Sequence, residues 1–170
     1  YVFFQSLVLD QSGNIILLTR APDLRQAHNT SNIKDVRIWV DKDGSNPTDN
    51  LKIILNEFSL KGKKIGIEYE AYGMTGRNAL RLNKSLENYC DIEDQSELIT
   101  KLRVIKSQEE IVYVKKAAEL ADKALDEAWK HSKAGASEAK ILAEMQRAVL
   151  EGGGDYPANE YIIGSGHNAL

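Results

Sequence analysis

The amino-acid sequence predicts an α/β fold, because segments that resemble β-strands alternate with segments that resemble amphipathic helices. Branched and aromatic residues concentrate in short runs at residues 1–9, 15–18, 36–40 and 64–69. After residue 46 and again after residue 74, apolar residues recur at the three- and four-residue spacing of a helix. With 170 residues, the chain has room for one domain or two small ones.

The first two runs predict a β-hairpin. Residues 10–14, with the sequence Asp-Gln-Ser-Gly-Asn, lie between them and contain the residue types that tight turns favour. A third strand is predicted at residues 36–40. Pro47 then opens a predicted helix, whose apolar residues occupy positions i, i+3, i+4 and i+7: Leu51, Ile54, Leu55 and Phe58.

A fourth strand and a second helix complete the predicted N-terminal domain. The strand spans residues 64–69, and Thr75 can cap a helix that continues to about Tyr89. Together these segments predict a mixed sheet with flanking helices at residues 1–101.

Beyond residue 101 the sequence pattern becomes mostly helical. Ser107 and Glu110 have the spacing of a capping box at the start of a long helix that ends near Ser132. A second helix is predicted at residues 137–150, and the glycines at 152–154 suit its C-terminal cap. Residues 161–163 predict a strand. Two helices and one strand form too small a core to stand alone, so residues 102–170 are expected to begin a larger domain.

Composition and charge exclude several functions. There are 22 basic and 25 acidic residues, a net charge of -3. Residues 1–101 hold 13 basic and 14 acidic side chains (-1) and the rest 9 and 11 (-2). Neither part has the basic excess that binding of nucleic acid or an anionic membrane requires. Cys90 is the single cysteine, so an internal disulfide is excluded and a cytoplasmic location is expected.

The two ends of the sequence differ from ordinary termini. The chain opens without Met on Tyr1, inside a predicted strand, and it closes on Leu170 just after another. Natural termini tend to be polar. We therefore expect the chain to be a segment of a longer protein.

The residues themselves show no catalytic or metal-binding constellation. His28, His131 and His167 are far apart in sequence, and His131 is explained as a favourable charge at the end of a helix. His167 lies in a loop of small residues directly after a predicted strand, a position where binding sites are often built. Cys90 is expected to be a small core residue rather than a nucleophile.

Several motifs resemble the creatinase, prolidase and aminopeptidase P family. Residues 102–111, Leu-Arg-Val-Ile-Lys-Ser-Gln-Glu-Glu-Ile, are similar to the run that leads from the family's N-terminal domain into its catalytic "pita-bread" domain. Residues 64–68, Lys-Ile-Gly-Ile-Glu, resemble a strand of that N-terminal domain, and residues 163–170 also fit. Residues 30–33, 36–39 and 152–157 look most like the branch that includes ectoine hydrolase and dimethylsulfoniopropionate lyase.

The resemblance implies a site that lies mostly beyond this chain. Peptidases of the family hold a dinuclear centre of Mn²⁺, Co²⁺ or Zn²⁺ on two Asp, one His and two Glu, all expected after Leu170. No metal ligand and no catalytic residue is therefore assigned within residues 1–170. His167 and Asn168, in the family's "G-x-N" motif, are the candidates for the substrate pocket, although His167 occupies the motif's variable position.

The expected function is that of the N-terminal portion of a Xaa-Pro peptidase-like or creatinase-like hydrolase, inactive by itself. The resemblance implies a small peptide or small-molecule substrate and a homodimer, with no nucleic-acid or membrane partner. Two alternatives remain open. One is a non-catalytic module for binding or dimerisation with the same fold, and the other is a lyase or small-molecule amidohydrolase.

Overall fold

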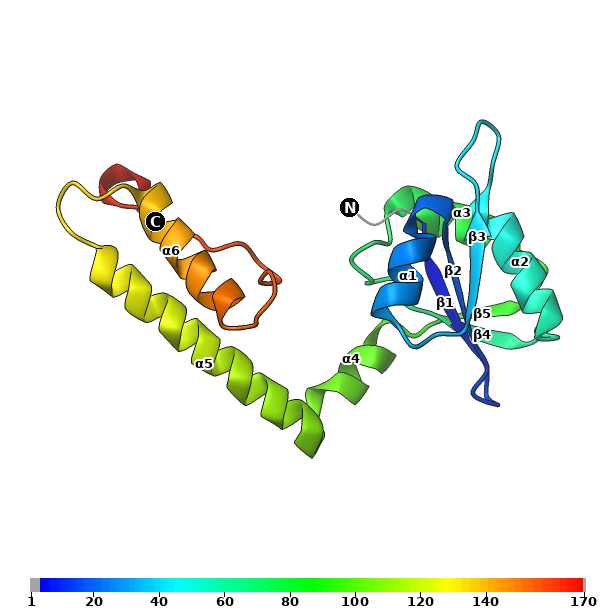
Figure 1. The fold of residues 1–170 in the computed structure, drawn as a ribbon. Coiled ribbons are helices and arrows are strands. Elements are labelled where there is room, and N and C mark those ends of the chain that lie inside the picture. The colour runs from blue at the N-terminus through cyan, green and yellow to red at the C-terminus, as the bar shows by residue number, and fades with distance from the viewer. Residues whose placement is uncertain (1–3, 170) are drawn as a thin grey trace. The chain divides into compact units, whose positions relative to one another are not determined.

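The computed structural model describes residues 4–169, apart from the side chain of Asn168 (Figure 1). The chain forms two compact units, which we call the N-terminal unit (Tyr1–Val104) and the C-terminal unit (Ile105–Leu170). The sequence placed the boundary after Lys101, which lies within helix α4 (Ser96–Val104) of the structure. Residues 1–3 of the predicted first strand lie outside the described residues.

A three-stranded mixed sheet opens the N-terminal unit, in the order β1-β2-β3. Its strands are β1 (Ser6–Leu9), β2 (Ile15–Arg20) and β3 (Asp35–Trp39). The first two are antiparallel, and β3 runs parallel to β2. The predicted hairpin is confirmed: its turn is held by Asp10 Oδ1, which accepts the N–H groups of Ser12 and Asn14 at 2.9 Å each.

Helix α1 (Leu24–Thr30) forms the crossover between the parallel strands β2 and β3, after a single 3₁₀ turn, η1 (Ala21–Asp23). Sequence patterning missed this helix. It has seven residues and buries Ala27 alone, so it carries no apolar stripe for periodicity to detect.

A second sheet pairs β4 (Lys64–Ile67) with β5 (Asp91–Asp94) in parallel. Helices α2 (Pro47–Glu57) and α3 (Gly76–Leu86) are amphipathic as predicted and contact each other. Thr75 caps α3 by accepting the N–H of Asn78 at 3.2 Å. The structure ends α3 at Leu86 and β4 at Ile67, both earlier than predicted, and sequence patterning missed β5 and α4.

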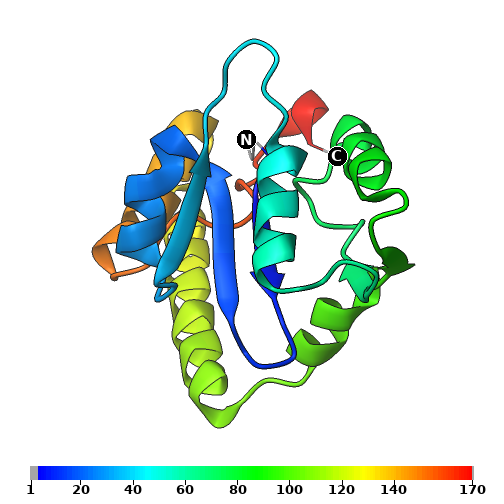
Figure 2. The same ribbon diagram turned by 90° about the vertical axis from the view of Figure 1, so that its right-hand side faces the viewer.

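Apolar side chains from both sheets and from α2 and α3 form one core in the N-terminal unit. Trp39 closes one side of this core, and its indole N–H donates to the carbonyl of Phe4 at 2.9 Å. The loop between β3 and α2 projects beyond the strand ends (Figure 2). The buried members of the core are Phe4, Val8, Ile16, Leu18, Trp39, Leu51, Ile54, Leu55, Ile67, Leu82, Leu86 and Tyr89.

Helices α5 (Gln108–His131) and α6 (Glu138–Glu151) lie side by side in the C-terminal unit (Figure 1). The predicted capping box starts α5: Ser107 N–H donates to Glu110 Oε2 at 2.7 Å, and Glu110 N–H donates to Ser107 Oγ at 3.2 Å. In the described part of the chain, each helix is too short or too polar to cross a bilayer.

The predicted strand at residues 161–163 is wrong. These residues have no regular secondary structure, and a 3₁₀ turn, η2 (Gly166–Asn168), follows them. A strand is stabilised by its ladder of backbone hydrogen bonds to a neighbour. Within the described residues this segment pairs with none, so its apolar sequence alone does not make it a strand.

Candidate functional site

The loop that carries His167 lies at the end of the C-terminal unit. His167 belongs to the turn η2 and is exposed to solvent. A hydrogen bond ties this loop to the start of α6: Ser165, two positions before His167, donates from Oγ to Glu138 Oε1 at 2.5 Å. His28 belongs to the other unit and His131 to the end of α5. His131 clusters with Glu127 and Glu144, and neither His28 nor His167 is a member of that cluster.

Charged side chains form a cluster between α5 and α6, which we call the α5–α6 clasp. Glu127 of α5 contacts Lys130 Nζ and His131 Nε2, both at 3.2 Å. From α6, Arg147 Nε donates to Glu144 Oε2 at 2.8 Å, and its guanidinium reaches Glu127 at 4.0 Å. The clasp links the two helices through alternating charges.

The clasp has the donor atoms of a metal site but the charges of an ion-pair network. Atoms of Glu127, His131 and Glu144 lie within 4.8 Å of one another. Arg147 lowers the pKa of Glu144 by hydrogen bonding, and Lys130 lowers the pKa of Glu127 in the same way. The carboxylates are thus already neutralised by protein cations. This arrangement does not fit a dinuclear metal centre, which needs carboxylates that are free to bind the ions.

The glycine run after α6 sets the path of the chain toward the His167 loop. Gly153 has φ +85°, and its N–H donates to Leu150, while the N–H of Gly154 donates to Val149. These two bonds form a Schellman cap, and they confirm the glycine C-cap that the sequence predicted at residues 152–154. A Cβ on Gly152 would lie 2.4 Å from Leu120 Cδ2 of α5. The glycines therefore also allow α5 to approach the end of α6 closely.

In the N-terminal unit, Ser96 organises a compact polar network where β4 and β5 end. Asp94 Oδ1 accepts both the N–H of Ser96 at 3.0 Å and its hydroxyl at 2.5 Å. Ser96 Oγ in turn accepts the N–H groups of Tyr69 and Glu70, at 2.9 and 3.3 Å. The hydrogen bonds from Ser96 lower the pKa of Asp94. The Asp94 carboxylate and the Ser96 hydroxyl each accept hydrogen bonds from nearby backbone N–H groups, so their role is structural.

Cys90 packs against the core of the N-terminal unit, as expected for a small core residue. It is half-buried, and desolvation raises the pKa of its thiol. Because the thiolate is the nucleophilic form, this environment opposes a nucleophilic role.

Comparison with known proteins identifies both units. Residues 1–105 match the model of the creatinase/prolidase N-terminal domain, and residues 112–170 match that of metallopeptidase family M24. The chain is 30% identical over 173 aligned residues to a Xaa-Pro dipeptidase of Pyrococcus horikoshii, covering 99% of this chain and 46% of that protein. It is 34% identical over 86 residues to the Xaa-Pro dipeptidase of Pyrococcus furiosus, covering 51% and 25%.

Solved structures show the same architecture. The X-Pro aminopeptidase of Thermotoga maritima superimposes with a TM-score of 0.71 at 21% identity, over 88% of this chain and 38% of that one. A dipeptidase of P. horikoshii gives a TM-score of 0.62 at 26% identity, over 87% and 38%. The chain thus spans less than half the length of these relatives. With a model match over residues 1–105 and 30% identity across 99% of its length to a Xaa-Pro dipeptidase, the chain belongs to the creatinase/prolidase family of M24 metallopeptidases.

Proposed function

We propose that this chain is the N-terminal part of a hydrolase that cleaves Xaa-Pro peptides. The observation that carries the proposal is the continuous 30% identity, across both units, to the Xaa-Pro dipeptidase of P. horikoshii. The N-terminal unit corresponds to the accessory domain, and the C-terminal unit contributes the first two helices of the catalytic domain.

The catalytic metal centre of such a hydrolase belongs outside residues 1–170. In the described part of the chain, the Glu127, His131 and Glu144 cluster is neutralised by Arg147 and Lys130. A divalent cation, Mn²⁺, Co²⁺ or Zn²⁺, would supply an activated water for attack on the peptide bond. The role that we propose for this chain is to support and border the site.

The test is to compare the complete gene product with this chain on a panel of Xaa-Pro dipeptides and longer Xaa-Pro peptides. The complete product is expected to hydrolyse them, to lose activity with a chelator and to recover it with Mn²⁺, Co²⁺ or Zn²⁺. Residues 1–170 alone are expected to show no hydrolysis and no stoichiometric tight metal binding by calorimetry. A folded complete product that binds Xaa-Pro peptides without cleaving them would instead indicate a binding module.

His167 and Asn168 are proposed to border the substrate pocket. Two observations support this for His167: its side chain is exposed, and its loop is anchored to α6 by the Ser165–Glu138 hydrogen bond. In the complete protein, His167→Ala should raise KM for the peptide with little change in unfolding midpoint. His28→Ala, also an exposed histidine, is the matched control and should change neither quantity. Equal KM values for both variants and the parent would contradict a role for His167.

The complete protein is further proposed to be a cytoplasmic homodimer. Helix α5 exposes Tyr113, Leu125 and Trp129, and apolar side chains of this size are usually covered, either by the rest of their own domain or by a second copy of the chain. A dimer mass in sedimentation experiments at micromolar concentration is the expected result. A monomer at the same concentration would overturn the proposal.

A further inference from the structure

The loop between β3 and α2 contains the one Asp-Gly pair of the sequence, Asp43–Gly44. This loop projects beyond the strand ends (Figure 2), and residues 40–44 are all exposed to solvent. When glycine follows aspartate, no Cβ shields the glycine nitrogen, so this nitrogen can attack the carboxyl carbon of the aspartate side chain. The pair therefore has the chemistry for a covalent rearrangement of the backbone.

Residues 42–45 form a tight turn around this pair. Ser45 N–H donates to the carbonyl of Lys42 at 3.0 Å, and Gly44 has φ +76°. A positive φ at the third position is typical of a type II turn, which favours glycine there. In the other direction, Lys42 N–H donates to Ser45 Oγ at 3.3 Å. Two hydrogen bonds thus close the turn around the Asp43–Gly44 bond and involve neither of its two residues.

The two groups that would react are both free of partners in the described part of the chain. No described residue accepts the N–H of Gly44. No described residue donates a hydrogen bond to the Asp43 carboxylate or forms an ion pair with it, and the side chain is exposed. A Cβ at position 44 would meet nothing within 4 Å, so neighbouring atoms leave space for the carboxyl group to approach the nitrogen.

We propose that Asp43–Gly44 is a site of spontaneous isomerisation through a cyclic succinimide. The Gly44 nitrogen forms a bond to Asp43 Cγ, and the hydroxyl of the protonated carboxyl group leaves with the amide hydrogen as water. Water then adds to either carbonyl of the ring. Addition at Cγ breaks the new bond and restores aspartate. Addition at the main-chain carbonyl breaks the original peptide bond and gives isoaspartate, with the chain continued through Cγ.

The reaction needs no cofactor, and it is independent of the proposed peptidase activity. Its product carries a free main-chain carboxylate at residue 43. This group is the substrate of carboxyl methyltransferases that use S-adenosylmethionine and recognise isoaspartate. The modified loop would therefore be a substrate for that class of enzyme, whereas the unmodified loop would not.

Two other aspartates in turns or loops are held in ways that oppose the same reaction. Asp41, in the same loop, precedes Lys42, whose N–H is engaged by Ser45 Oγ. Asp10 lies in the hairpin turn, where its Oδ1 accepts two backbone N–H groups. Both are followed by residues that have a side chain, which hinders attack by the next nitrogen. The isomerisation is therefore expected at Asp43 and not at these two positions.

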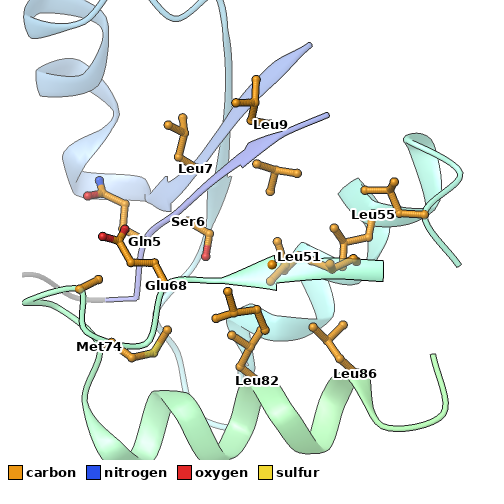
Figure 3. A pocket seen from close by; sticks show the side chains of 16 residues that line it. Gln5, Ser6, Leu7, Leu9, Leu51, Leu55, Glu68, Met74, Leu82 and Leu86 are labelled. Carbon is orange, nitrogen blue, oxygen red and sulfur yellow. The ribbon is translucent and has the colours of Figure 1, made fainter. Parts of the chain in front are cut away.

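Among the described residues that line the apolar cavity of the N-terminal unit, none is an aspartate (Figure 3). The cavity has a volume of about 260 Å³, and Glu68 is the charged residue in its lining. A glutamate would have to close a larger ring, and the next N–H, that of Tyr69, already donates to Ser96 Oγ at 2.9 Å. The interior of this unit therefore lacks the reactive pair that the exposed loop has.

Isomerisation should also open the turn. The isoaspartyl linkage adds a methylene group to the backbone between Lys42 and Ser45, inside the ring that their two hydrogen bonds close. Because both bonds depend on the present spacing, we expect the modified loop to lose them. The change lies just before Asn46, whose side chain caps α2 by accepting the N–H of Thr48.

Ageing of the complete gene product at neutral pH tests the proposal. Isoaspartate in the intact protein is counted with isoaspartyl methyltransferase and S-adenosylmethionine, and it is located by peptide mapping with electron-transfer fragmentation. We expect progressive conversion at Asp43, through an intermediate lighter by one water, with Asp41 unchanged. Asp43→Glu keeps the charge and should abolish this gain in methyl acceptance. Asp41→Glu is the matched control and should leave the gain as it is in the parent.

The same protein unfolded in urea provides the reference rate. The folded protein should isomerise at Asp43 within severalfold of that rate, because the turn leaves both reacting groups free. A folded protein that stays unmodified while the unfolded chain reacts would show that the turn blocks the attack. Equal gains in the parent and in Asp43→Glu would place the modification elsewhere. No isoaspartate in either state would equally overturn the proposal.

Discussion

The two units differ in how much of their apolar surface they bury. The N-terminal unit has a cluster of twelve buried side chains drawn from both sheets and two helices. In the described residues of the C-terminal unit, the buried apolar residues are Ala124 and Ile141. The 24 residues of α5 present Tyr113 and Trp129 at 71% and 74% exposure. The N-terminal unit thus has the core of a domain. The C-terminal unit has two helices whose outer apolar faces are not packed against a core in the described residues.

This difference shows that an amphipathic sequence pattern predicts a helix but does not predict which part of the protein its apolar face packs against. Helix α2 buries Leu51, Ile54 and Leu55 against the core of its own unit. Helix α5 has an equally regular sequence pattern and buries Ala124 alone. Stability should therefore respond to core substitutions in the N-terminal unit and to helix-pairing substitutions in the C-terminal unit.

The largest expected effect is in the core of the N-terminal unit. Leu18 is fully buried, so Leu18→Ala should lower the free energy of unfolding by about 2–5 kcal/mol through lost burial and the cavity left behind. Urea denaturation followed by circular dichroism measures it. Leu80→Ala is the control, because Leu80 is 74% exposed and should change stability by less than about 0.5 kcal/mol. Equal effects of the two variants would contradict the assigned core.

A smaller effect is expected where α5 approaches the end of α6. In Gly154→Ala, the new Cβ would lie 2.9 Å from Leu120 Cδ1 and 3.0 Å from the carbonyl of Val149. Relieving this overlap should cost about 1–3 kcal/mol, seen as a lower melting temperature by circular dichroism. Gly76→Ala is the matched control, since its Cβ would meet nothing within 4 Å. A neutral Gly154→Ala would show that the two helices pack less closely than described.

The smallest expected effect is electrostatic and depends on pH. Arg147 lowers the pKa of Glu144 in the folded state. A lowered carboxyl pKa gives stability that is present above the unfolded value of about 4.3 and is lost as pH falls through the folded pKa. In Arg147→Met, the decrease in urea midpoint between pH 7 and pH 3 should therefore be smaller than in the parent.

High salt provides the control for this electrostatic prediction. At about 1 M NaCl the screening length falls to roughly 3 Å, so the parent and Arg147→Met should converge in midpoint at pH 7. A difference that persists at high salt would mean that the Arg147 side chain stabilises the helices by packing rather than by charge.

Features set by neighbouring residues could be predicted from the sequence. The capping box of Ser107 and Glu110, the Thr75 cap and the Asp10 turn each depend on groups within four residues of one another. The glycine C-cap at residues 152–154 was predicted for the same reason, because glycine readily adopts the positive φ that Gly153 has in the structure.

Features set by distant partners could not be predicted. Strand β5, with the sequence Asp-Ile-Glu-Asp, has one apolar residue and is a strand because its backbone pairs with β4. Residues 161–163 show the reverse: an apolar sequence without a partner in the described residues remains irregular. In the clasp, Glu127 and Arg147 are twenty positions apart, and only the turn between α5 and α6 brings them together. The loop position of His167 was foreseeable, whereas its anchoring by Ser165 and Glu138 was not.

The capping box at Ser107 also has a consequence for how this gene can be divided. Both reciprocal hydrogen bonds that start α5 come from residues 107–110, so the helix carries its own start signal. A cut in the coding sequence at residue 105, where the second unit begins, would leave both of these hydrogen bonds on the same side of the cut. Recombination at this point would transfer the α5 start intact to a different N-terminal domain.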